Sequence, residues 1–148
     1  MHTRYSHPFG ALLMDIDGLK RINDAHGHQA GDRVLMQVAI AMQRSIRSVD
    51  TAARLGGDEF CILAPDQDAT AGLILAERLA TAVRDEVATP GDPPVGISIG
   101  VVSCPLHGQD AERLIDVADR AMYRAKASGE TVALGEPDGA AVMEEAKR

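Results

Sequence analysis

The sequence is short of positive charge. Its 22 aspartates and glutamates outnumber 15 lysines and arginines, which gives a formal net charge of -7 at pH 7. Proteins that bind nucleic acid or anionic membranes non-specifically need a basic face, so this charge balance argues against both classes. A ligand that carries phosphate therefore needs a metal ion or a local basic pocket in this protein.

Cysteine and long apolar runs are scarce as well. The two cysteines, Cys61 and Cys104, each lie inside an apolar run typical of a strand. Cysteine in such runs usually behaves as a small buried hydrophobe in a reducing compartment, and a disulfide is the less favoured alternative. No apolar run approaches the ~18 residues of a membrane span, and the N-terminus lacks the pattern of a cleaved signal. We therefore expect a cytoplasmic domain without membrane contact.

The length and composition suit one domain with a single core, since 45% of the 148 residues are hydrophobic. The apolar run at 9–16 predicts a central strand that is buried on both faces. Apolar spacing also places Ile74 and Ile115 on the inner faces of two later helices. Residues 135–148 have weak patterning and are expected to form a tail or a loosely docked helix.

The remaining patterns predict the order of the elements. They indicate a helix within 31–50, a β-hairpin within 51–65, a helix at 70–88, a strand at 95–105, a helix at 110–128 and a short strand at 131–134. This order predicts an α/β protein of the α+β sandwich type, in which helices cover a central, mainly antiparallel sheet.

Two pairs of acids stand out from these patterns. Asp15 and Asp17 lie at the end of the first strand, and Asp58 and Glu59 lie at the tip of the hairpin. If the strand lies beside the hairpin, Asp15 and Asp58 face one another. Close carboxylates raise each other's pKa unless a cation lies between them, and oxygen ligands favour Mg²⁺ or Mn²⁺. The alternative is that these acids are simply solvated, which suits Asp17 best.

The segments FGALLMDIDGLKRINDAHGHQAGD and RLGGDEF together resemble the GGDEF domains, the diguanylate cyclase family. Two further motifs follow in family order: SIG at 98–100, and AD.AMYRAK, which ends at Lys126. The resemblance runs from residue 9 to residue 131. It implies a ferredoxin-like, palm-type nucleotide cyclase fold whose β-hairpin carries the GGDEF motif, in a domain of residues 1–134.

The resemblance also implies the metal ligands and the catalytic residues. Asp15, the backbone carbonyl of Ile16 and Asp58 match the positions that bind Mg²⁺ or Mn²⁺ carrying the GTP phosphates. Glu59 matches the remaining acid of the motif, which assists the metal or accepts the proton of the attacking hydroxyl.

Six further residues concern the nucleotide. Asn23 and Asp32 match the positions that hold guanine, whose N1 and N2 donors suit a carboxylate. Lys20 and Lys126 match phosphate-binding positions, and the residues 56–57, both glycine, allow close approach to the backbone. The structural alternatives are a turn residue for Asn23, a helix cap for Asp32, exposed helix charges for the lysines and plain hairpin glycines.

The tetrapeptide RSVD, from Arg47 to Asp50, precedes the hairpin. In isolation it is a helix C-terminus with a basic residue suited to the helix dipole. At this offset the family has an R-x-x-D product-inhibition site, so Arg47 and Asp50 resemble ligands of cyclic di-GMP. Arg78 matches a position from which relatives often add another arginine.

As a member of this family, the protein would condense two GTP into cyclic di-GMP and two pyrophosphates, which is nucleotidyltransferase chemistry with product inhibition. Two domains would have to face each other in a homodimer, so an isolated monomer is expected to be weak or inactive. Full-length relatives dimerise through an attached sensor domain or coiled coil. The alternative is a catalytically weak or inactive GGDEF domain that senses cyclic di-GMP.

Three features depart from the family pattern. The chain starts shortly before the first strand, where relatives have a helical segment, so we expect it to be truncated. Gly18 and Leu19 replace a bulky residue and phenylalanine, which is expected to loosen the loop facing the phosphates. Glu130 stands where an arginine that contacts phosphate is usual, and its charge is expected to repel GTP.

Overall fold

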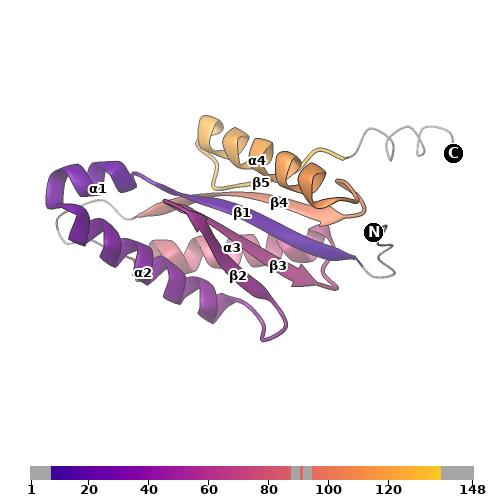
Figure 1. Ribbon diagram of the computed structural model, residues 1–148, viewed down its shortest axis with the longest axis horizontal. Helices are drawn as coiled ribbons and strands as arrows, with labels where there is room; N and C mark the ends of the chain where they lie inside the picture. Colours follow the sequence, from indigo (N-terminus) through magenta and orange to yellow (C-terminus); the bar gives the residue numbers. More distant parts are fainter. Residues whose placement is uncertain (1–7, 88–90, 92–94, 138–148) are drawn as a thin grey trace, which may run out of the picture.

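The computed structural model describes residues 8–87, 91 and 95–137. Figure 1 labels the helices and strands of these residues. In chain order they are β1 Phe9–Asp17, α1 Leu19–His26, α2 His28–Ser45, β2 Thr51–Gly56, β3 Glu59–Pro65, α3 Ala69–Glu86, β4 Gly96–Cys104, α4 Ala111–Ser128 and β5 Val132–Leu134. The predicted elements are therefore all present, and the short helical turn that the sequence indicates after the first strand is the helix α1.

The strands form one sheet in the order β2-β3-β1-β4-β5. The neighbouring pairs are antiparallel, except that β4 and β5 are parallel. The first four strands have the order of a ferredoxin-like βαββαβ unit, to which α4 and β5 are added. The predicted α+β fold with a mainly antiparallel sheet is confirmed.

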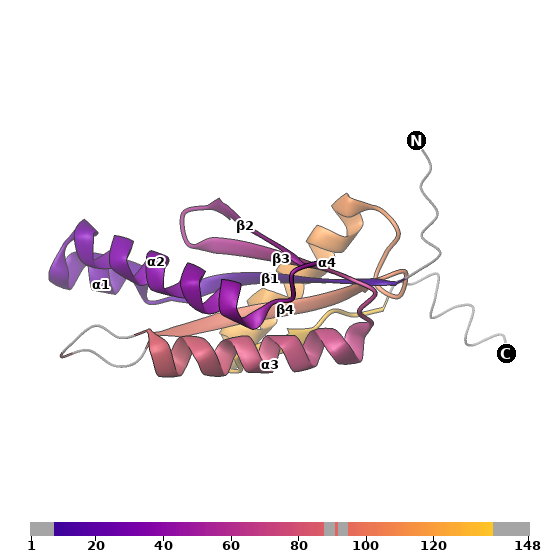
Figure 2. The ribbon, with the colours of Figure 1, turned by 90° about the horizontal axis from the view of Figure 1, so that it is seen from below.

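Helices cover both faces of the sheet (Figure 2). Leu12, Met14 and Ile16 of β1 belong to the main core, which includes buried residues of α2 and α3. Leu13 points to the other face and packs with residues of α4 such as Leu114. Because successive side chains of a strand point to opposite faces, burial on both faces gives β1 its continuous apolar sequence.

Two helix faces differ from those that the sequence predicts. Ile74 and Ile115 are 61% and 55% exposed, although both were expected in the core. In α3 the buried stripe runs through Leu75, Leu79 and Val83, and Ile74 lies beside it. Neighbouring helical residues point about 100° apart, so only one set of apolar residues can face the sheet. Packing against the sheet selects that set, and the spacing alone does not.

A single glycine separates α1 from α2. Gly27 has φ of 90°, a left-handed conformation that favours glycine, and it ends one helix and begins the next. Because α2 starts at His28, Asp32 lies within the helix, and no side chain caps its N-terminus. The capping alternative for Asp32 is therefore wrong.

The two cysteines are free thiols on β3 and β4. Cys104 is buried and Cys61 is half-buried, and burial raises the pKa of both thiols. Across the helices of the described ranges, none has the length and apolar character needed to cross a membrane. Most of the expected tail, residues 138–148, lies outside the described residues.

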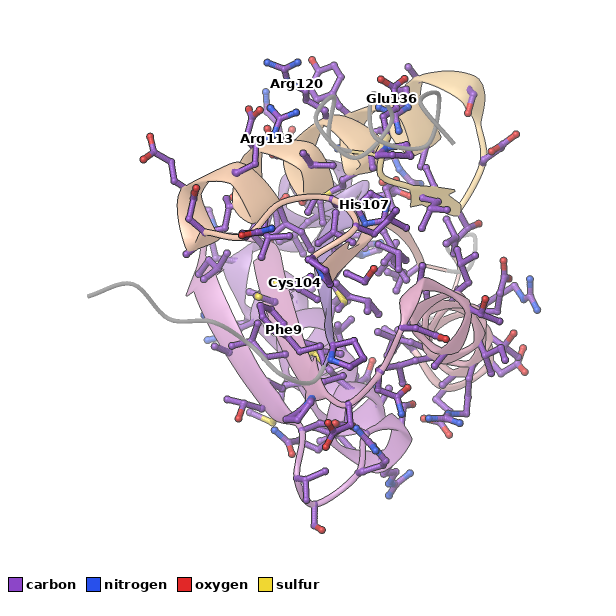
Figure 3. All side chains as sticks on the ribbon, turned by 90° about the vertical axis from the view of Figure 1, so that its right-hand side faces the viewer. Phe9, Cys104, His107, Arg113, Arg120 and Glu136 are labelled. Atoms are coloured by element: carbon purple, nitrogen blue, oxygen red, sulfur yellow. The ribbon has the colours of Figure 1, made fainter. Side chains whose placement is uncertain are left out.

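His107 is fully buried on the side of the sheet covered by α4 (Figure 3). Its Nδ1 accepts a hydrogen bond from the amide of Ser103 at 2.8 Å. Burial lowers the pKa of His107 below its ordinary value of 6.5, and contacts with the backbone of Gly135 and Ser103 offset only part of this effect. The imidazole is therefore neutral in the folded protein over a wider pH range than in the unfolded chain.

We expect the free energy of unfolding to decrease as the pH falls below 6.5 towards the lowered pKa of His107, because the unfolded chain binds the proton first. Urea denaturation at about pH 7.5 and about pH 5.5 measures this loss. His107→Gln removes the titrating group and should reduce the difference between the two pH values. An equal difference in the variant would assign the pH dependence to another group.

Candidate active site

The strand pairing brings the hairpin turn against the end of β1. Asp15 lies opposite Glu59 in the register of β1 with β3, and residues 57–58 form the turn between β2 and β3. The amide of Ile16 donates a hydrogen bond to the carbonyl of Asp58 at 3.2 Å. Residues directly opposite one another project to the same face of a sheet, so Asp15 and Glu59 share the face that α4 covers. The expected placement of the first strand beside the hairpin is confirmed.

The turn is open above its backbone. Gly57 has φ of 49°, in the left-handed region. At both Gly56 and Gly57, no heavy atom of the described residues other than the glycine and its chain neighbours lies within 4 Å of the position that a Cβ would take. Arg54 braces the turn, because its Nε and Nη2 donate to the carbonyl of Gly57 at 2.9 and 2.6 Å. A ligand therefore has room to approach the backbone of this turn.

Asp15 is a largely enclosed acid of the site. Its Oδ2 accepts a hydrogen bond from Nζ of Lys126 at 3.0 Å, and its side chain is 17% exposed. Its Oδ1 is buried and has no hydrogen-bond partner among the described residues. Burial raises the pKa of Asp15, Lys126 opposes that shift, and the nearby carboxylate of Asp58 adds to it. Asp15 and Asp58 therefore do converge.

Lys126 lies between two acids of β1. Its Nζ is 3.0 Å from Asp15 and 4.0 Å from Oδ1 of Asp17, and the hydrogen bond with Asp15 is the main cause that raises the pKa of Lys126. Asp17 is also held by the hydroxyl of Ser98, which donates to its two oxygens at 2.9 and 3.2 Å. Asp17 belongs to β1 rather than lying past its end. The expectation that Asp17 is simply solvated is wrong, because β4 supplies a partner.

The donors at this position suit Mg²⁺ or Mn²⁺. Carboxylate oxygens are the ligands that these ions prefer, and Oδ1 of Asp15 is an enclosed oxygen that lacks a partner among the described residues. Within the described ranges, no three His, Cys, Asp or Glu side chains gather closely enough to hold a metal ion. Mg²⁺ typically takes one or two carboxylates together with water and substrate phosphates, so Asp15 and Asp58 are a sufficient pair of side chains.

Asn23 and Asp32 lie where α1 meets α2. Figure 1 shows this helix pair at the end of the sheet to which β1 leads. Oδ1 of Asn23 is buried without a partner among the described residues, and it lies against Gly31, where a Cβ would overlap it. Asp32 follows Gly31 and is exposed, and Lys20 is exposed on α1. Asn23 and Asp32 are thus close in the fold, but their contact with guanine is still a prediction.

The R-x-x-D segment forms a compact group outside this site. Nη2 of Arg47 donates to Oδ1 of Asp50 at 2.8 Å and to the carbonyl of Pro65 at 2.7 Å, and the amide of Arg47 donates to Oδ2 of Asp50 at 2.8 Å. Nη2 of Arg78 donates to the carbonyl of Ser45 at 2.6 Å. The structure therefore brings Arg47 and Asp50 together and places Arg78 against the end of α2.

The ionisation of Asp50 follows from these neighbours. Its side chain is only 2% exposed, and this burial favours the neutral acid. The hydrogen bonds from the side chain and amide of Arg47, together with the charges of Arg47 and Arg78, outweigh burial and lower the pKa of Asp50. The carboxylate is therefore ionised at neutral pH, held by hydrogen bonds from Arg47 and favoured by the nearby charge of Arg78.

Sequence reasoning assigned no role to two residues that hold the site together, Arg54 and Ser98, although both lie in the quoted motifs. The brace from Arg54 to Gly57 lies within one hairpin, and an arginine just before a glycine turn was the only signal for it. The bond from Ser98 to Asp17 joins residues 81 positions apart, so no local pattern reports it. Arg54 positions the backbone of the turn and Ser98 positions the carboxylate of Asp17, so neither residue by itself indicates a reaction.

The sequence matches the family model described as "Diguanylate cyclase, GGDEF domain" over residues 1–131. The response regulator PleD of Caulobacter vibrioides is 39% identical over 132 residues, which are 86% of this chain and 29% of PleD. Diguanylate cyclase A of Treponema denticola is 38% identical over 120 residues, or 80% of this chain and 32% of that protein. The chain thus spans about a third of the length of these curated relatives.

Solved structures show the same fold. The GGDEF domain of YfiN (TpbB) from Pseudomonas aeruginosa has a TM-score of 0.83 at 31% identity, covering 90% of this chain and 86% of that one. The GGDEF domain of DgcB from Caulobacter crescentus, in complex with c-di-GMP, has a TM-score of 0.79 at 27% identity, covering 86% and 77%. With the family match over residues 1–131, these likenesses show that the chain belongs to the GGDEF domain family of diguanylate cyclases.

Proposed function

We propose that this domain is the catalytic domain of a diguanylate cyclase, which condenses two GTP into cyclic di-GMP and two pyrophosphates. The observation that carries the proposal is the convergence of Asp15 and Asp58, with one buried oxygen of Asp15 left without a partner among the described residues. Nucleotidyltransferase relatives of this chain support the same chemistry.

Asp15, Asp58 and the carbonyl of Ile16 would hold Mg²⁺ or Mn²⁺, with Glu59 beside them. When bound, this ion neutralises phosphate charge and lowers the barrier to attack at phosphorus. If Asp15 bound the ion in place of its hydrogen bond with Lys126, Nζ of Lys126 would be free to contact the phosphates. The open backbone of the glycine turn leaves space for the same nucleotide.

The base and the other phosphates would be held from α1 and α2. Asn23 and Asp32 would pair with the guanine edge, and Lys20 would contact the phosphates from the exposed side of α1. In each half-reaction the 3′-oxygen of one GTP forms a bond to the α-phosphorus of the other. The bond between the α-phosphorus and the bridging oxygen breaks, pyrophosphate leaves, and Glu59 accepts the hydroxyl proton.

Each domain would hold one GTP, so two domains must face each other as a homodimer. We propose that an upstream sensor domain or coiled coil provides this contact in the cytoplasm. The test compares initial rates of cyclic di-GMP formation by the free domain and by domains fused to a dimerising coiled coil. The proposal is supported if the fused domains form cyclic di-GMP much faster per domain than the free domain does. It is contradicted if the fused domains leave GTP unreacted.

A second function is favoured by the group around Asp50. The buried carboxylate of Asp50, bonded to Arg47 and near the charge of Arg78, suits a guanine base and a phosphate, as expected for binding cyclic di-GMP. Glu130 is exposed and lines a cavity that Asp17 and Lys126 also line, where its charge opposes binding of a triphosphate. A sensor of cyclic di-GMP would therefore bind the product without turning over GTP.

Arg47→Ala is expected to weaken the binding of cyclic di-GMP to the isolated domain at least about tenfold, since it removes charge-assisted hydrogen bonds. Isothermal titration calorimetry measures this change. In a dimer that turns over GTP, the same variant should lose inhibition by product. Arg44→Ala is the matched control, because Arg44 is exposed on the last turn of α2, just before the turn that carries Arg47 and Asp50. Equal affinity in the Arg47 and Arg44 variants would place the product elsewhere.

A further inference from the structure

A cavity of about 400 Å³ opens at the edge of β4, beside the acids of β1. β5 pairs with β4 only at residues 99–101, so among the described strands residues 96–98 have no partner on that side. The cavity occupies this gap. Asp17 and Lys126 contribute to its wall, which makes it continuous with the candidate active site.

Four charged side chains line the cavity: Asp17, Lys126, Arg84 and Glu130. Lys126 already contacts Asp15 at 3.0 Å. Arg84, near the end of α3, is 65% exposed, and its ion pair among the described residues is with Asp85 at 3.8 Å, beyond hydrogen-bond distance. Lys126 thus has a hydrogen-bond acceptor, whereas the N–H groups of the Arg84 side chain have none among the described residues.

We propose that Arg84 binds the terminal phosphates of the nucleoside triphosphate in this cavity. The proposal rests on the proposed function, because it places the reacting end of the nucleotide at Asp15 and Asp58. From there the cavity offers room for the remaining phosphates between the ends of α3 and α4. A guanidinium group binds phosphate oxygens through two parallel N–H bonds, and its fixed charge offsets that of Glu130. Arg84 is thus a substrate-binding residue specific for the polyphosphate tail.

The test separates the tail from the rest of the nucleotide. Binding of GTP and of GMP to the monomeric domain is measured by calorimetry in the presence of Mg²⁺. Arg84→Ala is expected to weaken GTP about tenfold and to leave GMP unchanged, because GMP lacks the terminal phosphates. Arg84→Lys keeps the charge and should recover part of the affinity. The midpoint of thermal unfolding should not move, since Arg84 is largely exposed.

Arg120→Ala is the matched control. Figure 3 shows Arg120 on the outer side of α4, and its ion pair is with Asp116 at 3.3 Å. If the wild type binds GTP and the Arg84→Ala and Arg120→Ala variants bind it equally well, the role of Arg84 is overturned and the proposed function still stands. If the wild type itself binds no GTP with Mg²⁺, the proposed function fails and the role of Arg84 fails with it. Equal losses for GTP and GMP in Arg84→Ala would also overturn the proposal.

Discussion

Asp58→Ala is expected to reduce cyclic di-GMP formation by enforced dimers at least about a hundredfold, the scale of losing a group that orients or stabilises reacting charge. The variant removes one of the two carboxylates that would share the divalent ion. It should not unfold the domain, because Asp58 raises the pKa of Asp15, and its removal relieves a repulsion. We therefore expect activity to fall while the free energy of unfolding is unchanged or slightly higher.

Rates of product formation and urea denaturation of the same preparations measure the two effects. Glu77→Ala is the matched control, because Glu77 is an exposed acid on α3 and should leave both quantities unchanged. Asp58→Asn keeps the shape of the side chain and separates charge from packing. A variant at position 58 that retains most of the activity would remove Asp58 from the metal site.

Gly100→Ala is expected to lower the free energy of unfolding by about 3 kcal/mol, at the upper end of the cost of overpacking a core. A Cβ at Gly100 would lie directly against the carbonyl oxygen of Ala118 and 2.7 Å from the backbone nitrogen of Met122. Both atoms belong to the backbone of α4, so no change of rotamer relieves the clash. The helix must move as a whole, and Lys126 near its end moves with it.

Urea denaturation of the wild type and the variant measures this effect. Gly10→Ala is the matched control, since it also adds a methyl group in a buried strand but meets atoms at 3.4 Å or more. The control should cost less than about 1 kcal/mol. Similar stability of the Gly100 and Gly10 variants would show that α4 does not approach the sheet as closely as in this structure.

Much of the fold follows from local patterns in the sequence. The apolar run of β1 predicts a strand buried on both faces, and the glycines of the hairpin predict a turn that carries Asp58. The inward faces of α3 and α4 were only partly predicted, as Ile74 and Ile115 show. Periodicity defines which residues share a face, whereas the shape of the sheet decides which of two neighbouring faces is buried.

The candidate site divides in the same way. The sequence identifies Asp15 and Asp58 as the acids of the site. Once β1 pairs with β3, it also predicts that their carboxylates lie close together. The contact of Lys126 with Asp15 spans 111 positions, and it depends on how α4 crosses the sheet. The enclosed oxygen of Asp15 and the cavity beside Arg84 depend on burial in three dimensions, which no short motif encodes.

The most direct measurement is a crystal structure of the domain with Mn²⁺ and a GTP analogue that cannot react, with the ion located by its anomalous scattering. We predict one anomalous peak bonded to Oδ1 of Asp15 and to the carboxylate of Asp58 at about 2.1 Å, with phosphate oxygens completing the coordination. Nucleotide density without an ion between these two carboxylates, or an ion bound elsewhere, would contradict the shared metal site.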